Sequence, residues 1–229
     1  ALILPFSQFW NYKLAKVLRL FGLEIQNVDY YHKGHPPREH ILALLGDRVG
    51  LRKPLDLPRI FLNAEEEARQ ILPKSDKPWV GIQSTGLSTW TDNKNWGVES
   101  FREVANLLRE KVSLVQFGQE TDPDLPVDLN LQGKLKIREV FIALRQCRAF
   151  VGQEGFLMHA AKSMDTKSVI IYGGFLAPWQ TGYDSNTNLY SAVECAPCWL
   201  EAQCPFDKKC MTMIQPKNVA DMVLTILSA

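Results

Sequence analysis

The 229-residue sequence predicts an α/β protein built on a parallel β-sheet that helices cover on both faces. Two observations predict this fold class. From Trp79 onward, short apolar runs alternate with segments whose apolar residues recur every three or four positions, as strands and helices of such proteins do. The composition, 46% hydrophobic and 22% charged, is that of a chain that buries a core, which excludes a disordered or fibrous protein.

The elements after Trp79 follow in a regular order. The expected helix over Val98–Glu110, for example, turns its apolar residues Phe101, Val104, Leu107 and Leu108 inward. In chain order we expect a strand at Val80–Ile82, the helix at Val98–Glu110, a strand at Val112–Phe117, a helix at Ile137–Gln146, a strand at Ala149–Val151, a helix at Leu157–Met164, a strand at Ser168–Tyr172 and a helix at Lys217–Leu227.

The first sixty residues are less regular. We expect strands at Ala1–Pro5 and Glu24–Tyr31 and helices at Asn11–Gly22 and Arg38–Val49. The two prolines of Arg52–Arg59 indicate a linker, so we divide the chain into a domain over 1–57 and a domain over 58–229. Because Ala1 opens a strand with nothing before it, we expect the chain to start partway through its first domain. The histidines of this region, which lack accompanying carboxylates, fit a solvated cluster better than a metal site: His32, His35 and His40.

Charge and hydropathy exclude several classes of protein. With 26 basic against 25 acidic residues, the chain lacks the broad basic face of a nucleic-acid-binding protein. No apolar run approaches the ~20 residues that cross a bilayer, and no basic n-region or small-residue cleavage site marks a secretory signal. Four of the five cysteines lie in the short segment 195–210, unlike the spread-out pairs of a secreted disulfide scaffold. We therefore expect a cytoplasmic location, with Cys147 a small buried apolar residue.

The loop after the first strand of this sheet contains a candidate anion site. Ser84 and Thr85 follow the strand, and Lys94 precedes the next helix. In parallel sheets, ligands lie beyond the carboxyl ends of the strands, and helix-start amides and lysines favour negative charge. A solvated loop with polar caps explains the same residues about as well.

A second candidate loop follows the strand that ends at Val151. It reads Gly152-Gln153-Glu154-Gly155-Phe156-Leu157-Met158-His159, with glycines flanking an acidic residue where a helix should begin. Glu154 can accept hydrogen bonds from a ligand hydroxyl, and the free amides of a helix start can face a phosphate. Taken alone, an acidic residue at a helix start and a core histidine are the simpler explanation.

The cysteine-rich segment (residues 195–210) is a candidate metal site. Its thiols are spaced C-x2-C-x5-C-x5-C, and four thiolates suit zinc or iron: Cys195, Cys198, Cys204 and Cys210. Four reduced thiols packed in an aromatic loop are an equal alternative, and the role is structural in either case. Because the segment follows the last expected strand, we expect it to lie apart from the phosphate-binding loops.

These loops together resemble glycosyltransferase family 9, the lipopolysaccharide heptosyltransferases. The resemblance rests on the order of five segments: Val80–Ile82, Lys94-Asn95-Trp96, Val151–His159, Ser168–Tyr183 and Cys195–Cys210. Members of the family carry a Lys-x-Trp motif, a Val-Gly-Asn-Asp-Ser-Gly-Pro-Met-His run and a cysteine-rich segment. The run aligns here without a gap, but Glu154 replaces an aspartate, Gly155 a serine and Phe156 a glycine that lets the backbone approach the diphosphate.

The resemblance implies a GT-B architecture of two Rossmann-like domains with the donor bound by the second. Residues 1–57 would then be the end of an acceptor-side domain. Ser84, Thr85 and Lys94 would approach the diphosphate, and Glu120 would meet the ribose or base. The loop after Val151 would cover the phosphates through Gln153, Glu154, Gly155, Phe156 and His159. The family's catalytic base, an aspartate of the first domain, has no counterpart in this sequence.

The function that the resemblance implies is inverting transfer of a heptose-like sugar from a nucleotide diphosphate donor. The acceptor would be a lipopolysaccharide or other surface glycan, reached at the inner face of the membrane. Side chains would do the work of a divalent ion, so no such ion is needed for transfer, and zinc or iron would be structural. The alternatives are a non-catalytic nucleotide- or glycan-binding relative and a cysteine-cluster module that stabilises an assembly.

Overall fold

The computed structural model describes residues 2–4, 25–27, 40–48, 58–85 and 91–228. The chain divides into two compact units, Ala1–Asp56 and Leu57–Ala229. In the first unit, β1 (Leu2–Leu4) pairs in parallel with β2 (Ile25–Asn27), and α2 covers Ile41–Arg48, in agreement with the elements expected there.

Two other expectations for this unit lie outside the described residues. These are the helix at 11–22 and the histidines His32 and His35. His40 is described, and its Nδ1 accepts a hydrogen bond of 3.2 Å from the backbone N–H of Leu42 at the start of α2.

The second unit contains a six-stranded sheet in which every neighbouring pair is parallel. Its order is β5-β4-β3-β6-β7-β8, so the predicted parallel sheet is confirmed. Every residue of β4, β6 and β7 is buried, as expected of strands with a helical layer on each face. The strands are β3 (Trp79–Gln83), β4 (Ser113–Phe117), β5 (Leu129–Asn130), β6 (Ala149–Gln153), β7 (Ser168–Ile171) and β8 (Thr187–Leu189).

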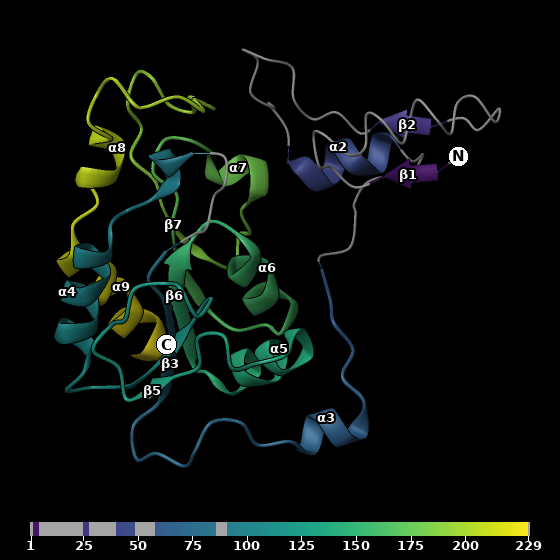
Figure 1. Cartoon of the computed structure of the whole chain (residues 1–229), viewed down its shortest axis with the longest axis vertical. Helices are drawn as coiled ribbons and strands as arrows, with labels where there is room; N and C mark the ends of the chain where they lie inside the picture. The colour runs from purple at the N-terminus through teal and green to yellow at the C-terminus, as the bar shows by residue number, and fades with distance from the viewer. Residues whose placement is uncertain (1, 5–24, 28–39, 49–57, 86–90, 229) are drawn as a thin grey trace. The chain divides into compact units, whose positions relative to one another are not determined.

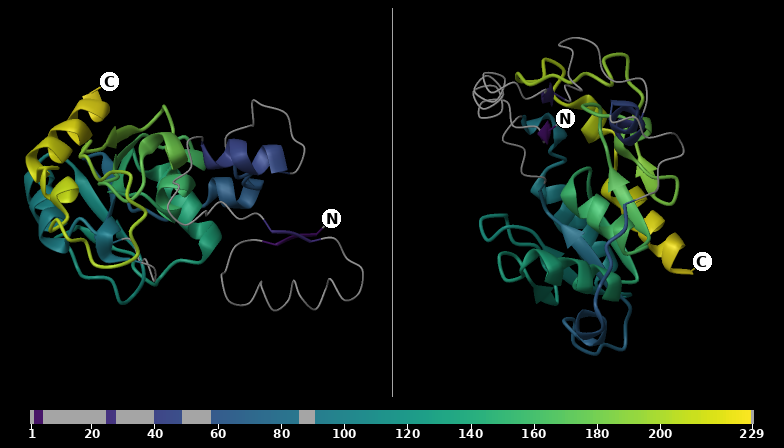
Figure 2. Two further views of the ribbon diagram at one scale, coloured as in Figure 1. Left: turned by 90° about the horizontal axis from the view of Figure 1, so that it is seen from above. Right: turned by 90° about the vertical axis from the view of Figure 1, so that its right-hand side faces the viewer.

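Helices cover both faces of this sheet. α4 (Val98–Leu108) packs beside α9 (Pro216–Ser228) on one face, and α5 (Ile137–Gln146) beside α6 (Phe156–Ser163) on the other (Figure 1). Figure 2 shows the same two helical layers from two further directions. The positions of these four helices agree with the sequence-based expectations.

The buried stripe of α4 corrects one detail of the expected pattern. Phe101, Val104, Ala105 and Leu108 are 0% exposed, which is the i, i+3, i+4, i+7 spacing of a single helical face. Leu107 was expected to face inward but is 44% exposed, because it lies beside that stripe rather than on it.

The chain before β3 is fixed along α5. The helix α3 (Ala64–Ala68) starts with a capping box in which the side chains of Asn63 and Glu66 each bond the other's backbone N–H. Arg138 of α5 pairs with Glu66, and Gln146 Oε1 accepts hydrogen bonds from the backbone of Ile71 and Leu72 at 3.0 and 2.9 Å. These contacts fix the segment before β3 against α5 within the second unit.

Several short elements were not expected from the sequence. They extend over two to five residues each, too short for a periodic pattern, and tertiary contacts define them. They are α3, the 3-10 helix η1 (Asp92–Lys94), β5, α7 (Pro178–Thr181), β8 and α8 (Lys209–Thr212). Within the described ranges, no helix has the length and apolar character needed to span a membrane.

Candidate donor-binding site

The sheet order places a crevice between β3 and β6. From β3, the chain builds outward through β4 and β5 on one side, and then resumes with β6, β7 and β8 on the other. The loops that leave the carboxyl ends of β3 and β6 therefore diverge, and an open α/β sheet binds its ligands at such a point. The loops expected to carry the site follow Gln83 and Gln153, the last residues of these two strands.

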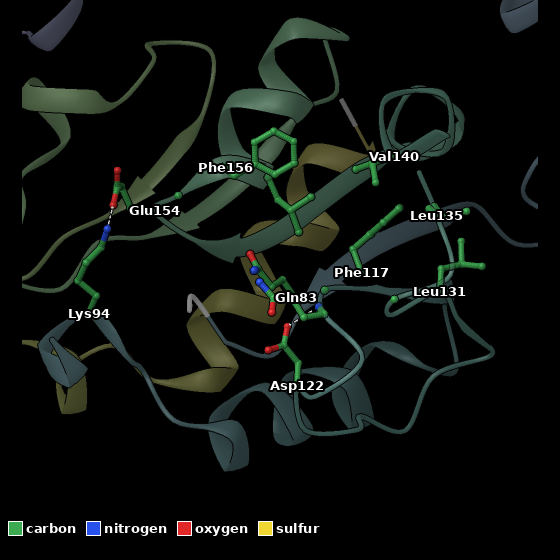
Figure 3. Close-up of a pocket in the computed structure, with 14 residues that line it drawn as sticks. Gln83, Lys94, Phe117, Asp122, Leu131, Leu135, Val140, Glu154 and Phe156 are labelled. Atoms are coloured by element: carbon green, nitrogen blue, oxygen red, sulfur yellow. Dashed lines mark hydrogen bonds and ion pairs between the residues drawn. The ribbon is translucent and has the colours of Figure 1, made fainter. Parts of the chain in front are cut away.

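A pocket of about 320 Å³ lies at this end of the sheet, within the range of small-molecule sites. Figure 3 shows a charged end, where Lys94 faces Glu154, and an apolar region around Val140, Leu131 and Leu135. The lining residues are Gln83, Lys94, Phe117, Gly118, Gln119, Asp122, Leu131, Gly133, Leu135, Val140, Glu154, Gly155, Phe156 and Leu157.

An ion pair between Lys94 and Glu154 forms the charged end. The Lys94 Nζ contacts Glu154 Oε2, and the two side chains are 20% and 8% exposed. Lys94 ends η1, and Glu154 follows β6 directly, so the pair bridges the two loops of the crevice. A lysine at this depth can bind an anion with little competition from water, because burial weakens solvent screening.

Gln153 fixes the turn that carries Lys94. Its Nε2 donates to the backbone oxygen of Lys94, and its Oε1 accepts a hydrogen bond of 3.2 Å from the backbone N–H of Trp96. The Trp96 indole in turn donates to the Ile214 oxygen at 3.0 Å. Gln153 is 2% exposed and does not line the pocket, so its contacts hold Lys94 in place rather than face a ligand.

Gly155 and Phe156, which depart from the family 9 run at the start of α6, both line the pocket. A Cβ built on Gly155 would meet nothing within 4 Å, so there is open space beside the helix start. Phe156 is 52% exposed and lies edge-on to Phe141, with ring centroids 6.1 Å apart. Phe156 lines the pocket (Figure 3).

The carboxylate beside β4 is Asp122, where Glu120 was expected. Asp122 is 8% exposed and lines the pocket, and its Oδ2 accepts a hydrogen bond of 2.9 Å from the backbone N–H of Gln119. A Cβ on Gly118, whose φ is +147°, would collide with that carboxylate. Glu120 is exposed and does not line the pocket, because the turn after β4 points it outward.

Ser84 and Thr85 differ in their surroundings. Ser84 is fully buried, donates to the Pro123 oxygen at 2.9 Å and accepts from Gln116 at 3.2 Å, so it stabilises the loop after β4. The Thr85 Oγ1 is buried and has no hydrogen-bond partner within the described residues. Neither Ser84 nor Thr85 lines the pocket.

His159 lies one turn into α6, away from the pocket lining. Its Nδ1 is 2.6 Å from the hydroxyl of Tyr183, and the two rings meet edge to face. Burial and the nearby Glu154 carboxylate raise the pKa of Tyr183 to about 12, so its hydroxyl stays protonated at neutral pH. The expected phosphate contact of His159 is not evident in this geometry, and the residue packs α6 against the segment after α7.

The four thiols of the cysteine-rich segment surround one small cavity of about 40 Å³. All four are free. Burial and the neighbouring thiols raise the pKa of Cys198 and of Cys210. In the described part of the chain, no group of three or more His, Cys, Asp or Glu side chains is arranged to hold a metal ion.

We expected the cysteine-rich segment to lie apart from the loops after β3 and β6, but it lies against the loop after β3. Asn93 of η1 forms part of the wall of the cysteine-lined cavity, next in sequence to Lys94. Sequence order does not predict this contact, because the segment returns from β8 to the carboxyl end of the sheet.

Comparison with models of protein families shows the family of this chain. The model of glycosyltransferase family 9 (heptosyltransferase) matches residues 25–210, which is most of the sequence. The chain belongs to glycosyltransferase family 9. The resemblance seen in the sequence motifs is thereby confirmed.

Individual relatives in this family are distant in sequence. The chain is 24% identical over 158 residues to lipopolysaccharide heptosyltransferase 2 of Salmonella typhimurium, covering 59% of this chain and 45% of the relative. The structure of ADP-heptose lps heptosyltransferase II from E. coli superposes with a TM-score of 0.61 at 20% identity, covering 79% of this chain and 56% of that one. The iron-containing dodecameric glycosyltransferase TibC from enterotoxigenic E. coli gives 0.69 at 17% identity, covering 88% and 58%.

These family 9 structures confirm the predicted GT-B type α/β fold. The chain spans 45% of the Salmonella relative and 56% of the E. coli structure. A further TibC structure holds ADP-D-β-D-heptose.

The family 9 motifs explain part of the pocket and leave another part unpredicted. Lys94, Glu154, Gly155 and Phe156 come from motif positions and line the pocket together. The sequence analysis missed Asp122 and the apolar wall formed by Phe117, Leu131, Leu135, Val140 and Leu157. One signal could have found Asp122: Gly118 follows directly after a strand, where close approach of another group requires glycine.

Proposed function

We propose that residues 58–229 form the donor-binding domain of a glycosyltransferase that transfers a heptose-like sugar from a nucleoside diphosphate to a lipopolysaccharide or other surface glycan. Residues 1–57 would belong to the acceptor-side domain. The observation that carries the proposal is the two-ended pocket at the β3/β6 crevice. Its apolar region suits a base and ribose, and its Lys94 end suits a diphosphate.

The proposed donor is an ADP-sugar. The E. coli relative is named an ADP-heptose enzyme, and TibC was solved with ADP-D-β-D-heptose. In the pocket, Lys94 would bind the diphosphate, and Asp122 is placed to accept hydrogen bonds from ribose or base. Glu154 would accept hydrogen bonds from hydroxyls of the sugar, and the open space beside Gly155 would receive the remaining phosphate.

The proposed reaction inverts the anomeric carbon. An acceptor hydroxyl attacks that carbon and passes its proton to a base, while the bond to the diphosphate breaks and its electron pair leaves with the diphosphate. Lys94 would stabilise the negative charge that develops on this leaving group. For the base we expect an aspartate of the acceptor-side domain, as the family resemblance implies. No divalent ion is required, because the cationic side chain takes that role.

Titration of the 229-residue chain with ADP and with adenosine tests this function. We expect ADP to bind more tightly than adenosine, because only ADP reaches Lys94. With ADP-heptose and a glycan acceptor, we expect this chain to bind the donor without releasing ADP, because its sequence has no counterpart of the base. Robust transfer by this chain would contradict the assignment of the base to the acceptor-side domain. Failure of ADP, UDP and ADP-heptose to bind would refute the proposal.

We also propose a structural role for the cysteine-lined cavity. The four soft sulfur ligands that line one small cavity, Cys195, Cys198, Cys204 and Cys210, would hold a structural zinc or iron. Because these thiols are not arranged as a metal site in the described structure, they would have to draw together around the metal. The metal would stabilise a segment that has no helix or strand between β8 and α8. TibC, an iron-containing glycosyltransferase of similar fold, supports this proposal.

Protein purified without chelator is expected to contain close to one equivalent of zinc or iron by elemental analysis. Cys198→Ser should lose that metal and loosen the segment around Trp199, because a structural metal's binding energy is also local folding energy. Acidification should release the metal, since thiolate ligands must be deprotonated. Cys147→Ser, at a buried cysteine outside the segment, should keep it. Four reactive thiols without metal would instead assign the cavity to packing alone.

A further inference from the structure

The turn that carries Lys94 is bonded to the cysteine-rich segment. Asn93, the residue before Lys94, is 6% exposed, and its Nδ2 donates to the backbone oxygens of Leu200 and Ala202 at 2.6 and 2.8 Å. The Thr91 hydroxyl donates to the same Leu200 oxygen at 3.2 Å. Both N–H groups of this buried amide donate to backbone more than a hundred residues away, so Asn93 joins the Lys94 turn to a distant part of the chain.

The two carbonyls lie inside the cysteine-rich segment. Leu200 and Ala202 fall between Cys198 and Cys204, and Asn93 itself lines the cavity that the thiols surround. The segment is attached to the sheet where the Cys198 N–H donates to the Gly174 oxygen at 2.8 Å, just beyond β7. A continuous set of contacts thus runs from the thiols through Asn93 to the backbone of Lys94.

The other side of η1 is held differently. There Gln153, the last residue of the buried central strand β6, bonds the backbone of Lys94 and Trp96. A strand packed on both faces is a fixed support. The cysteine-rich segment has no helix or strand before α8, and its four thiols line the cavity that Asn93 also lines, so this support of the turn is less constrained than β6.

We propose that Asn93 is a positioning residue that transmits the arrangement of the cysteine-rich segment to Lys94, so that affinity for the donor's diphosphate depends on the state of the thiols. The proposal rests on the proposed function, because the coupling is measured through a phosphate bound at Lys94. Asn93 does not line the donor pocket, so it acts through Lys94 and not by contact.

The test compares ADP with adenosine on the full chain. Asn93→Ala should weaken ADP by about 3- to 10-fold, the effect expected when hydrogen bonds that place a charged group are lost. Adenosine, which has no phosphate, should bind as it does to the parent. In the Lys94→Ala background, Asn93→Ala should have no further effect on ADP. Asn218→Ala, at an exposed asparagine of α9, is the matched control and should change neither affinity.

A second double-mutant cycle tests whether the thiols act on Lys94 through Asn93. Cys198→Ser should weaken ADP in the parent but not in the Asn93→Ala variant. If Asn93→Ala does not fold, Thr91→Val removes both the Leu200 contact and the cap that the Thr91 hydroxyl gives to the Asn93 N–H, and it should shift ADP affinity in the same direction.

The results separate the two proposals. A parent that binds no ADP would refute the proposed function. A parent whose ADP affinity falls with Lys94→Ala but not with Asn93→Ala or Thr91→Val would refute the coupling alone. Equal weakening of ADP and adenosine by Asn93→Ala would also refute it, because a general distortion of the pocket would then explain the loss.

Discussion

Lys94→Ala is expected to weaken ADP binding by about 1.5–3 kcal/mol, the range for a lost hydrogen bond between a charged donor and a phosphate. Lys94 is the basic side chain that both the loop pattern and the family motif place at the donor, and it lines the charged end of the pocket. Calorimetry on the folded variant measures the change, with adenosine as the ligand that should be unaffected.

The same substitution should also destabilise the fold. It leaves the Glu154 carboxylate, with a side chain 8% exposed, without its cation. Because Lys94 is itself 20% exposed, the cost should fall below the ~3–5 kcal/mol of breaking a fully buried pair. The double variant Lys94→Ala/Glu154→Gln should recover much of this stability without recovering ADP affinity, which separates the two effects.

Lys167→Ala provides the control for charge. This exposed lysine precedes β7, at the opposite end of the sheet from the pocket, so its loss should not change ADP affinity. If Lys94→Ala and Lys167→Ala had the same effect, or neither had one, Lys94 would not belong to the donor site.

Phe101→Ala is expected to lower the free energy of unfolding by about 3–5 kcal/mol, the range for a fully buried phenylalanine. Phe101 lies on the buried face of α4 and is 0% exposed, and its ring meets that of Trp96 edge to face with centroids 5.0 Å apart. The substitution therefore leaves a cavity beside the tryptophan of the Lys-x-Trp motif. Urea unfolding monitored by far-UV circular dichroism measures it.

Leu107→Ala on the same helix is the matched control. Leu107 is 44% exposed, so its loss should cost much less than the loss of Phe101. Similar costs at the two positions would show that the buried face of α4 is not the one described. ADP affinity should fall in the Phe101 variant more than adenosine affinity does, since Trp96 is bonded to Gln153 beside Lys94.

Much of the fold could be predicted from the sequence because its signal is local. Strands buried on both faces are continuous apolar runs, and helices on a sheet carry one apolar stripe, so β3, β4, β6, β7 and the four covering helices were found from pattern alone. β5 and β8 were missed because they are two and three residues long and only partly buried. Pairing with β4 and β7 defines them, and that pairing is not local information.

For the candidate site, too, the sequence predicted some of the residues and missed others. Sequence motifs and the family resemblance singled out Lys94, Glu154, Gly155 and Phe156, and the structure brings these four to one pocket. They also singled out Glu120 and His159, which the structure places outside it. A motif fixes which residues follow a strand, but the path of the turn decides which of them faces the crevice. In the turn after β4 that residue is Asp122, two positions beyond Glu120.

By itself, then, the sequence determined the parallel α/β fold, the family and the loop pair that carries the charged end of the pocket. Only the tertiary structure decided which neighbours hold that end in place. Gln153 of the central strand β6 bonds the backbone of Lys94. On the other side of the turn, Asn93 bonds the cysteine-rich segment, more than a hundred residues away. The physical reason is that buried amides must find hydrogen-bond partners wherever the packed chain offers them, and those partners are set by packing and not by spacing along the chain.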